Sequence, residues 1–144
     1  MVGRMAWMFP AGNPIQEVTS VTLVNTTAKT IDTTVPAGKR WMLIGIKASN
    51  PDDVNRIITI RKYKEAAKTN EIKTMASSTV TATTGKQQWP SGAGTDAETQ
   101  RQVYEVAEAG NTYSVTWSDP GASSGGTAAD GLVIEYLEVA VSEV

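Results

Sequence analysis

The sequence predicts an all-β protein, a two-sheet antiparallel β-sandwich of jelly-roll type, with an immunoglobulin-like sandwich as the alternative. Thr, Val and Ile are frequent, and these β-branched residues fit the pleated surface of a sheet. Gly, Pro, Asn, Asp and Ser cluster between the β-branched runs, where turns need them. Closely spaced turn signals separate about eight such runs, and no long run has helical periodicity.

The first half of the chain is expected to hold four strands, in this order: Glu17–Thr26, Thr30–Val35, Arg40–Ala48 and Val54–Lys64. The turn Pro36-Ala37-Gly38 introduces the third strand, because Pro suits the first turn position and Gly permits a positive φ. This third strand is the most apolar, and both of its faces are apolar: Trp41 and Leu43 lie on one, and Met42, Ile44 and Ile46 on the other. We read the two cations before it, Lys39 and Arg40, as solvated side chains at the strand's start, not as an anion site.

The second half continues the pattern with less certain boundaries. The stretch Tyr63–Met75 is rich in Lys, Glu and Ala, and it is compatible with a helical turn, a strand or a loop. The remaining expected strands are Ser77–Thr84, Gln100–Ala107, Thr112–Ser118 and Leu132–Val141, with long loops at 85–98 and 119–131. In Thr112–Ser118, strict alternation predicts Tyr113, Val115 and Trp117 facing inward and Thr112, Ser114 and Thr116 facing outward.

Composition excludes several classes of function. The 144 residues are the length of one domain, with net charge −2 and a pI of about 5.1. This balance gives no basic footprint for nucleic acid or for an anionic membrane surface. The chain contains neither Cys nor His, which rules out disulfides, thiolate metal sites and Ser-His hydrolytic triads. We therefore expect no enzyme, no cofactor and no metal centre.

Two apolar segments are the candidates for contact with other molecules. We divide the chain into an N-terminal apolar arm, residues 1–14, and one sandwich domain, residues 15–144. The arm carries Met5, Trp7, Met8 and Phe9, and burying a side chain of this size stabilises a structure by about 1.5–3 kcal/mol. These residues cover either an end of their own sandwich or a neighbouring subunit, and we favour the neighbour. Trp89 and Pro90 lie in a polar stretch and either fold back onto the sandwich or meet a partner.

Two acidic segments are weaker candidates. Asp52-Asp53 with Asn55 resembles a fragment of a calcium loop but lacks the ligand spacing and the closing Glu, so a turn is expected. Asp96 and Glu98 would be the acid and base of an enzyme, but nothing in the sequence places a second carboxylate pair opposite them.

Four segments carry a resemblance to a known class of proteins: VPAGKRWMLIGI (35–46), EAGNTYSVTWS (108–118), SSGGTAADG (123–131) and GLVIEYLEV (131–139). Together they resemble small all-β structural proteins of tailed bacterial and archaeal viruses, which decorate capsids or serve as minor capsid or tail components. The resemblance implies a β-sandwich that acts by binding itself and a lattice, often as a trimer. It implies no catalytic residues.

The expected function is accordingly that of a non-enzymatic structural protein of the virion. It would stabilise the capsid by forming a homo-oligomer, with a trimer favoured, and by binding the major capsid protein or another virion protein. The alternative is a carbohydrate-binding module, on a viral tail or fibre, with Trp41, Trp89 and Trp117 as the candidates for stacking on sugar rings.

Overall fold

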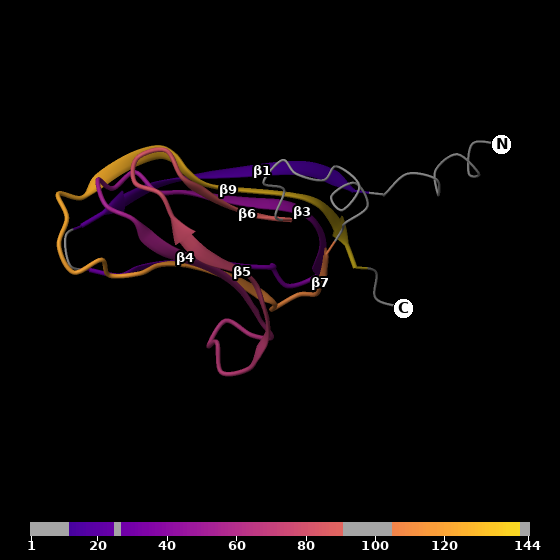
Figure 1. Ribbon diagram of the computed structural model, residues 1–144. Coiled ribbons are helices and arrows are strands. Elements are labelled where there is room, and N and C mark those ends of the chain that lie inside the picture. Colours follow the sequence, from indigo (N-terminus) through magenta and orange to yellow (C-terminus); the bar gives the residue numbers. More distant parts are fainter. Residues whose placement is uncertain (1–11, 25–26, 91–104, 142–144) are drawn as a thin grey trace.

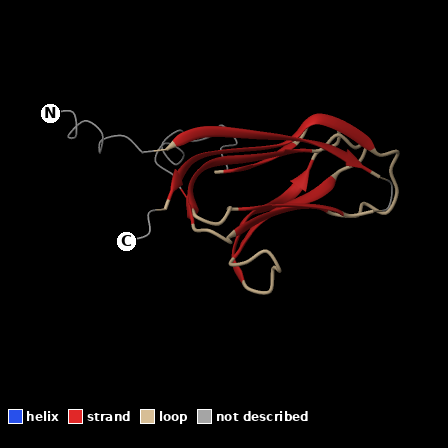
Figure 2. Cartoon of the chain, turned by 180° about the vertical axis from the view of Figure 1, so that it is seen from behind, coloured by secondary structure: helices blue, strands red, loops and turns tan. Residues whose placement is uncertain are grey.

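The computed structural model describes residues 12–24, 27–90 and 105–141, and it confirms the all-β sandwich. These residues form strands and loops without a helix (Figure 2). The strands are β1 (Asn13–Leu23), β2 (Lys29–Thr34), β3 (Lys39–Ser49), β4 (Arg56–Tyr63), β5 (Glu71–Val80), β6 (Lys86–Trp89), β7 (Glu105–Ala107), β8 (Thr112–Trp117) and β9 (Gly126–Ala140). They are arranged in two packed layers (Figure 1).

The strand order is that of a jelly roll. Sheet A has the order β1-β9-β3-β6, with β7 also paired to β3, and sheet B has the order β2-β8-β4-β5. The first strand thus pairs with the last, β2 with β8, β3 with β6 and β7, and β4 with β5. Such nested pairing is a long hairpin rolled into two sheets, which distinguishes this fold from the immunoglobulin-like alternative.

The core lies between the inner faces of the two sheets. Trp41 and Trp117 are its largest buried apolar side chains, with exposures of 1% and 0%. Each indole N–H is satisfied, because Trp41 Nε1 donates to Glu138 Oε2 at 2.9 Å and Trp117 Nε1 donates to the Ser49 carbonyl at 2.9 Å. Both tryptophans are scaffold and are closed to ligands.

A bulge in β3 corrects the predicted facing of its residues. Leu43 pairs with Tyr136 and Gly45 with Glu135, so Ile44 is an extra residue without an opposite partner. One inserted residue reverses the alternation that follows it. Ile46 therefore joins the inner face with 2% exposure, whereas Ile44 lies at the surface with 40% exposure.

The outward-facing residues of β8 are more buried than alternation predicts. Thr112 and Ser114 are 0% and 4% exposed, because β8 is a central strand whose outer face lies beneath charged neighbours. Ser114 pairs with Asp32 on one side and Arg61 on the other. Asp32 binds Lys68, and Arg61 lies 3.6 Å from Glu71, which together form a charged layer around the serine.

Three segments differ from, or resolve, the sequence-based expectation. Residues 86–89 were expected in a loop but form β6, and residues 126–131 were expected in a loop but begin β9. The ambiguous stretch after β4 is a loop, residues 64–70, that projects from the lower layer in Figure 1 and leads into β5. A short polar strand such as β6 has no apolar alternation and is recognised only by its partner β3.

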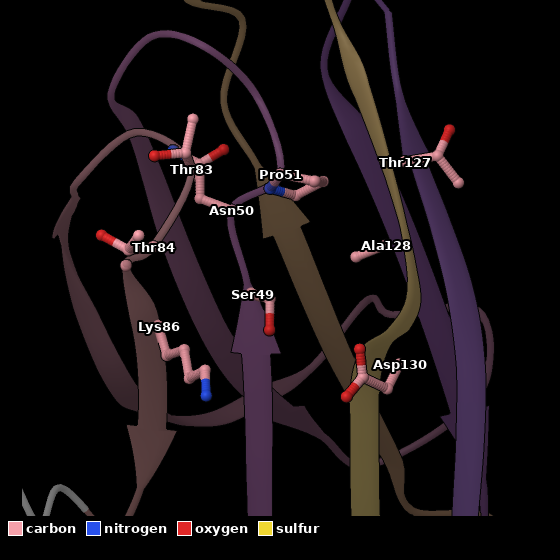
Figure 3. A pocket seen from close by; sticks show the side chains of 10 residues that line it. Ser49, Asn50, Pro51, Thr83, Thr84, Lys86, Thr127, Ala128 and Asp130 are labelled. Carbon is pink, nitrogen blue, oxygen red and sulfur yellow. The ribbon is translucent and has the colours of Figure 1, made fainter.

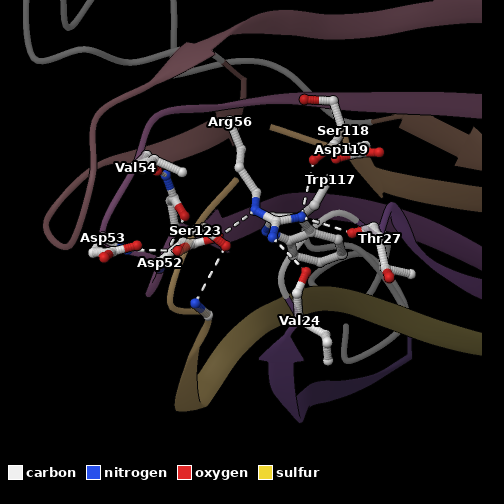
Figure 4. Close-up of polar contacts among 12 residues, drawn as sticks. Val24, Thr27, Asp52, Asp53, Val54, Arg56, Trp117, Ser118, Asp119 and Ser123 are labelled. Carbon is white, nitrogen blue, oxygen red and sulfur yellow. Dashed lines mark hydrogen bonds and ion pairs between the residues drawn. The ribbon is translucent and has the colours of Figure 1, made fainter. Parts of the chain in front are cut away.

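A buried ion pair joins the two sheets at one end (Figure 4). Arg56 donates from Nε to Asp52 at 2.7 Å and from its terminal nitrogens to the carbonyls of Val24, Thr27 and Ser118. Burial disfavours the charge of Asp52, but hydrogen bonds led by that from Arg56 outweigh it and lower the pKa of Asp52 to about 2. The segment read as a fragment of a calcium loop is therefore a turn, as predicted.

A second charged cluster ties β7 to sheet B. Glu105 lies between Lys62 at 2.6 Å and Lys73 at 2.8 Å, and the Lys62 ammonium also donates to the Val106 carbonyl. Partial burial opposes ionisation of Glu105, but the two lysines prevail and lower its pKa. The cluster fixes the start of β7 beside β3, and with it the position of Val106.

The edge strand β1 turns a charge inward. Glu17 pairs with the buried Ile134 and accepts a hydrogen bond from the Tyr136 hydroxyl on the inner face of sheet A. Tyr136 in turn stacks on Trp41, with ring centroids 3.7 Å apart. Burial and the hydrogen bond to Glu17 both raise the pKa of Tyr136. The register of β1 also shifts between Thr19 and Val21.

Candidate functional site

The outer face of sheet A carries an apolar surface, here called the sheet A face. It is made by seven side chains: Val18, Met42, Ile44, Val106, Val133, Leu137 and Val139. Val18, Ile44 and Val106 are 53%, 40% and 49% exposed. A sheet that packs by one side normally presents polar residues on the other, so this face departs from the pattern of a solvated surface.

Strand register gathers these residues from distant parts of the sequence. Val18 of β1 is opposite Val133 of β9, which makes one row across the sheet. In a second row, Leu137 of β9 is opposite Met42 of β3, and Met42 is opposite Val106 of β7. Apolar cross-strand neighbours of this kind support one another by direct contact.

A shallow groove of about 210 Å³ lies at the side of this face where β9, β3 and β6 run together. Ile44, Val133 and the segment Trp89-Pro90 form its apolar walls, and Lys47, Gln88 and Glu135 add polar groups. Trp89 ends β6, pairs with Ile46 and packs partly against the core. The polar groups include both signs of charge, so the groove's rim is compatible with a copy of itself.

The outer face of sheet B is more polar, although it is not without apolar side chains. Hydroxyl pairs join adjacent strands: Thr30 with Thr116 at 3.2 Å and Thr59 with Ser77 at 2.8 Å. Ile57 of β4 lies on this face and Ile72 lies on β5, and each is 48% exposed. Ion pairs Lys68–Asp32 and Arg61–Glu71 lie on the same face. These groups bind water or one another, so this face suits solvent.

The structure brings only part of the predicted contact site together. Trp89 and Pro90 lie beside the sheet A face, and Trp89 folds partly onto the sandwich while remaining half-exposed. Met5, Trp7, Met8 and Phe9 lie outside the described residues, as do Asp96 and Glu98. The description begins at residue 12, and Gly12 lies against Glu138 and Val139 at one end of the sheet A face.

Sequence reasoning missed most residues of the sheet A face. Val18, Val106, Leu137 and Val139 were read only as parts of strands, since the sequence does not show which face of a strand is covered. The available signal was the run Arg40–Ala48, in which both faces are apolar and one of them therefore has to meet something other than the core. Only one of those faces packs on the core, and the other is the sheet A face.

Within residues 12–24, 27–90 and 105–141, no group of three or more acidic side chains is placed to hold a metal ion. In the same part of the chain there is no helix of the length and apolarity that crossing a membrane requires. Comparison with known proteins gives no match among family models, curated proteins or solved structures.

Proposed function

We propose that this chain is a structural protein that associates with copies of itself through the sheet A face, as a component of a virus particle. The observation that carries the self-association is that the exposed Val18, Ile44 and Val106 are grouped with Met42, Val133 and Leu137 in apolar cross-strand rows on the outer face of sheet A. Sheet B also exposes Ile57 and Ile72, but among hydroxyl and charged side chains. Exposed, contiguous apolar surface is costly in a monomer and marks contact sites.

The size of the face suggests that each contact is weak. It is four strand positions wide and runs from Val133 to Val139 along β9. At a strand spacing of about 4.8 Å and a rise of about 3.3 Å per residue, this covers roughly 400 Å². A standard interface buries about 800 Å² on each partner. Contacts that are weak singly hold an assembly together when many copies are linked, because each further contact then forms at a high effective concentration.

The placement in a virion rests on the resemblance of four sequence segments and on the jelly-roll order of the strands. In this proposal the chain forms a homo-oligomer, with a trimer favoured, and binds the major capsid protein or another virion protein. The apolar arm would extend the contact that the sheet A face begins, because Gly12, which belongs to the arm, lies against Val139 at one end of that face. The chain needs neither a cofactor nor nucleic acid for this role.

Sedimentation velocity over a range of protein concentrations tests self-association. The wild type should show concentration-dependent oligomers, and Ile44→Lys should shift the chain to monomer because it places a charge at the middle of the face. The matched control is Thr30→Lys on the outer face of sheet B, which should sediment like the wild type. If both variants associate like the wild type, the sheet A face is not the contact surface.

A second candidate function is carbohydrate binding, and one observation favours it. Trp89 is half-exposed in a groove that also offers Lys47, Gln88 and Glu135 as hydrogen-bonding groups. Trp41 and Trp117 are excluded as residues that stack on sugar rings, because they are buried. Glycan-array binding by the wild type that is lost in Trp89→Ala would support this candidate, whereas an array without hits would leave self-association as the function.

A further inference from the structure

Sheet A forks at the end away from Val139. β9 pairs with β1 as far as Gly126, but its pairing with β3 stops at Leu132 opposite Ala48. The segment 126–131 therefore follows β1 alone and leaves a gap beside the end of β3. A pocket of about 490 Å³ lies in this gap, a volume typical of small-molecule sites. Figure 3 shows the side chains that line it.

A wide bulge in β9 places Asp130 in this pocket. Thr19 is opposite Leu132 and Val21 is opposite Ala128, so three residues, 129–131, face the single residue Ser20. A Cβ on Gly131 would lie only 2.5 Å from Cβ of Val21, which shows that the bulge requires glycine there. Bulges of this kind occur where a strand redirects a side chain at a site.

The opposite wall is the turn before β6, and it is held in an unusual conformation. Thr83 has a φ of 61°, in the left-handed region that β-branched residues rarely occupy. Behind the turn, the buried Asn50 donates from Nδ2 to the carbonyls of Val54 and Val80, both at 3.0 Å. A strained residue on a rigid support is typical of a preorganised binding site.

Two opposite charges lie on the two walls. Lys86 projects from the β6 side and Asp130 from the β9 side, with Ser49 between them (Figure 3). In the part of the chain that the structure describes, neither side chain has an ion-pair or hydrogen-bond partner. Thr84 and Thr127 also line the pocket, although the Thr127 hydroxyl is paired with that of Thr22 at 3.1 Å, and the lining contains no aromatic ring.

We infer that this pocket binds a small zwitterion, with the ligand's ammonium at Asp130 and its carboxylate at Lys86. A purely anionic or cationic ligand would gain from one wall and be repelled by the other. A sugar would lack the aromatic platform on which saccharide rings stack. This inference is independent of the proposed self-association, because the pocket's lining residues are not those of the sheet A face.

Titration with ω-amino acids, followed by amide chemical shifts in ¹H–¹⁵N spectra, tests the inference. The probes are glycine, 4-aminobutanoate and 6-aminohexanoate, and the preferred length reports the separation of the two charges. We expect saturable shifts at Ser49, Thr84 and Asp130. Butylamine and butanoate, which carry one charge each, should bind more weakly, and glucose should leave these amides unshifted.

Charge-reversal variants make the test sharper. Lys86→Asp and Asp130→Lys should each weaken binding of the best probe by about fivefold or more, because each replaces one exposed charge pair, which alone contributes up to about fivefold, with a repulsion. The double variant should recover binding, because it presents the same two charges in exchanged positions. Lys29→Asp, on β2 of sheet B, is the matched control and should bind like the wild type.

Three results would overturn the inference: no saturable shift with any zwitterion, equal binding of the singly charged probes, or shifts induced by glucose in place of the amino acids. Thermal unfolding of each variant checks that the exposed substitutions leave the fold intact. Loss of self-association without loss of these shifts would overturn the proposed function alone.

Discussion

The outer faces of the two sheets make the most informative comparison in this molecule. Both sheets contribute alternate residues to one core, yet their other sides differ in chemistry. Sheet A gathers Val18, Ile44 and Val106 on one apolar surface, whereas sheet B presents paired hydroxyls and ion pairs, with Ile57 and Ile72 exposed among them. Packing of the core accounts for the side chains on the inner faces. The chemistry of the outer faces is therefore what indicates the contacts that each side of the molecule makes.

The difference between the faces is the basis of the proposed function, and four experiments can break or sharpen it. They follow from the largest expected effect to the smallest. The first two test the buried Asp52–Arg56 ion pair, which joins the two sheets at one end. The last two test the outer faces themselves.

Arg56→Met should give the largest effect, a loss of about 3–5 kcal/mol in the free energy of unfolding. The substitution leaves Asp52 as an unpaired buried charge and leaves three carbonyls without their donor. Urea unfolding measures it. Arg40→Met is the matched control, because Arg40 makes an ion pair with Glu108 in which both side chains are about half exposed, 44% and 55%, and it should cost less than about 1 kcal/mol. Equal losses of stability in the two variants would show that the buried ion pair contributes no more than the exposed one.

Acid should lower the stabilisation that the Asp52–Arg56 ion pair gives the fold by up to about 2 kcal/mol. The pKa of Asp52 is about 2 in the folded chain, against an ordinary value of 3.8. A carboxyl with a lowered folded-state pKa stabilises the fold above its unfolded pKa, and that stability is lost as the pH falls from about 4 towards 2.

Urea unfolding at pH 7, 4 and 2 measures the dependence on Asp52. Asp52→Asn should be less stable at pH 7 and should lose less stability between pH 4 and pH 2. Glu105, whose pKa is also lowered, should contribute a smaller part of the same trend. An unchanged slope in Asp52→Asn would contradict the assignment.

Converting the sheet A face to the chemistry of the sheet B face should weaken self-association by about tenfold, or about 1.4 kcal/mol. Val18→Thr with Val106→Thr does this while preserving β-branched residues that suit a strand. Sedimentation equilibrium measures the association, and thermal unfolding should show little change in stability. Association as tight as that of the wild type would mean that apolar contact at these two positions is unimportant.

The smallest effect should come from Thr59→Val on sheet B. It removes one partner of the 2.8 Å hydrogen bond with Ser77, and such a loss costs about 1 kcal/mol. Differential scanning calorimetry would detect the lower stability, and self-association should be unchanged. A change in self-association would show that part of the contact surface lies on sheet B. That result would contradict the proposed difference between the two outer faces.

Much of the fold could be predicted from the sequence, because alternation and turns are local signals. The strands around Trp41, Ile58 and Val115, and the sandwich they form, follow from period and composition. The bulge at Ile44 could not be predicted, since it depends on pairing with β9. The burial of Ser114 likewise depends on Asp32 and Arg61, which come from different strands.

The candidate site was less predictable than the fold. Trp89 and Pro90 were identified because a large apolar side chain in a polar stretch is conspicuous. Val18 and Val106 were not, because an exposed valine and a buried one look alike in a sequence. Lys86 and Asp130 come to opposite walls of one pocket only through the fork and bulge of β9, which no local pattern indicates.

The inward Glu17 and the register shift of β1 limit how copies can join. A long edge strand invites another strand to add by backbone hydrogen bonds, and an inward charge and a local irregularity both discourage this. Copies that associate through the sheet A face but do not add strands at the β1 edge form clusters of limited size. At this edge, the same feature should therefore keep the concentrated protein from adding strands and growing into fibrils.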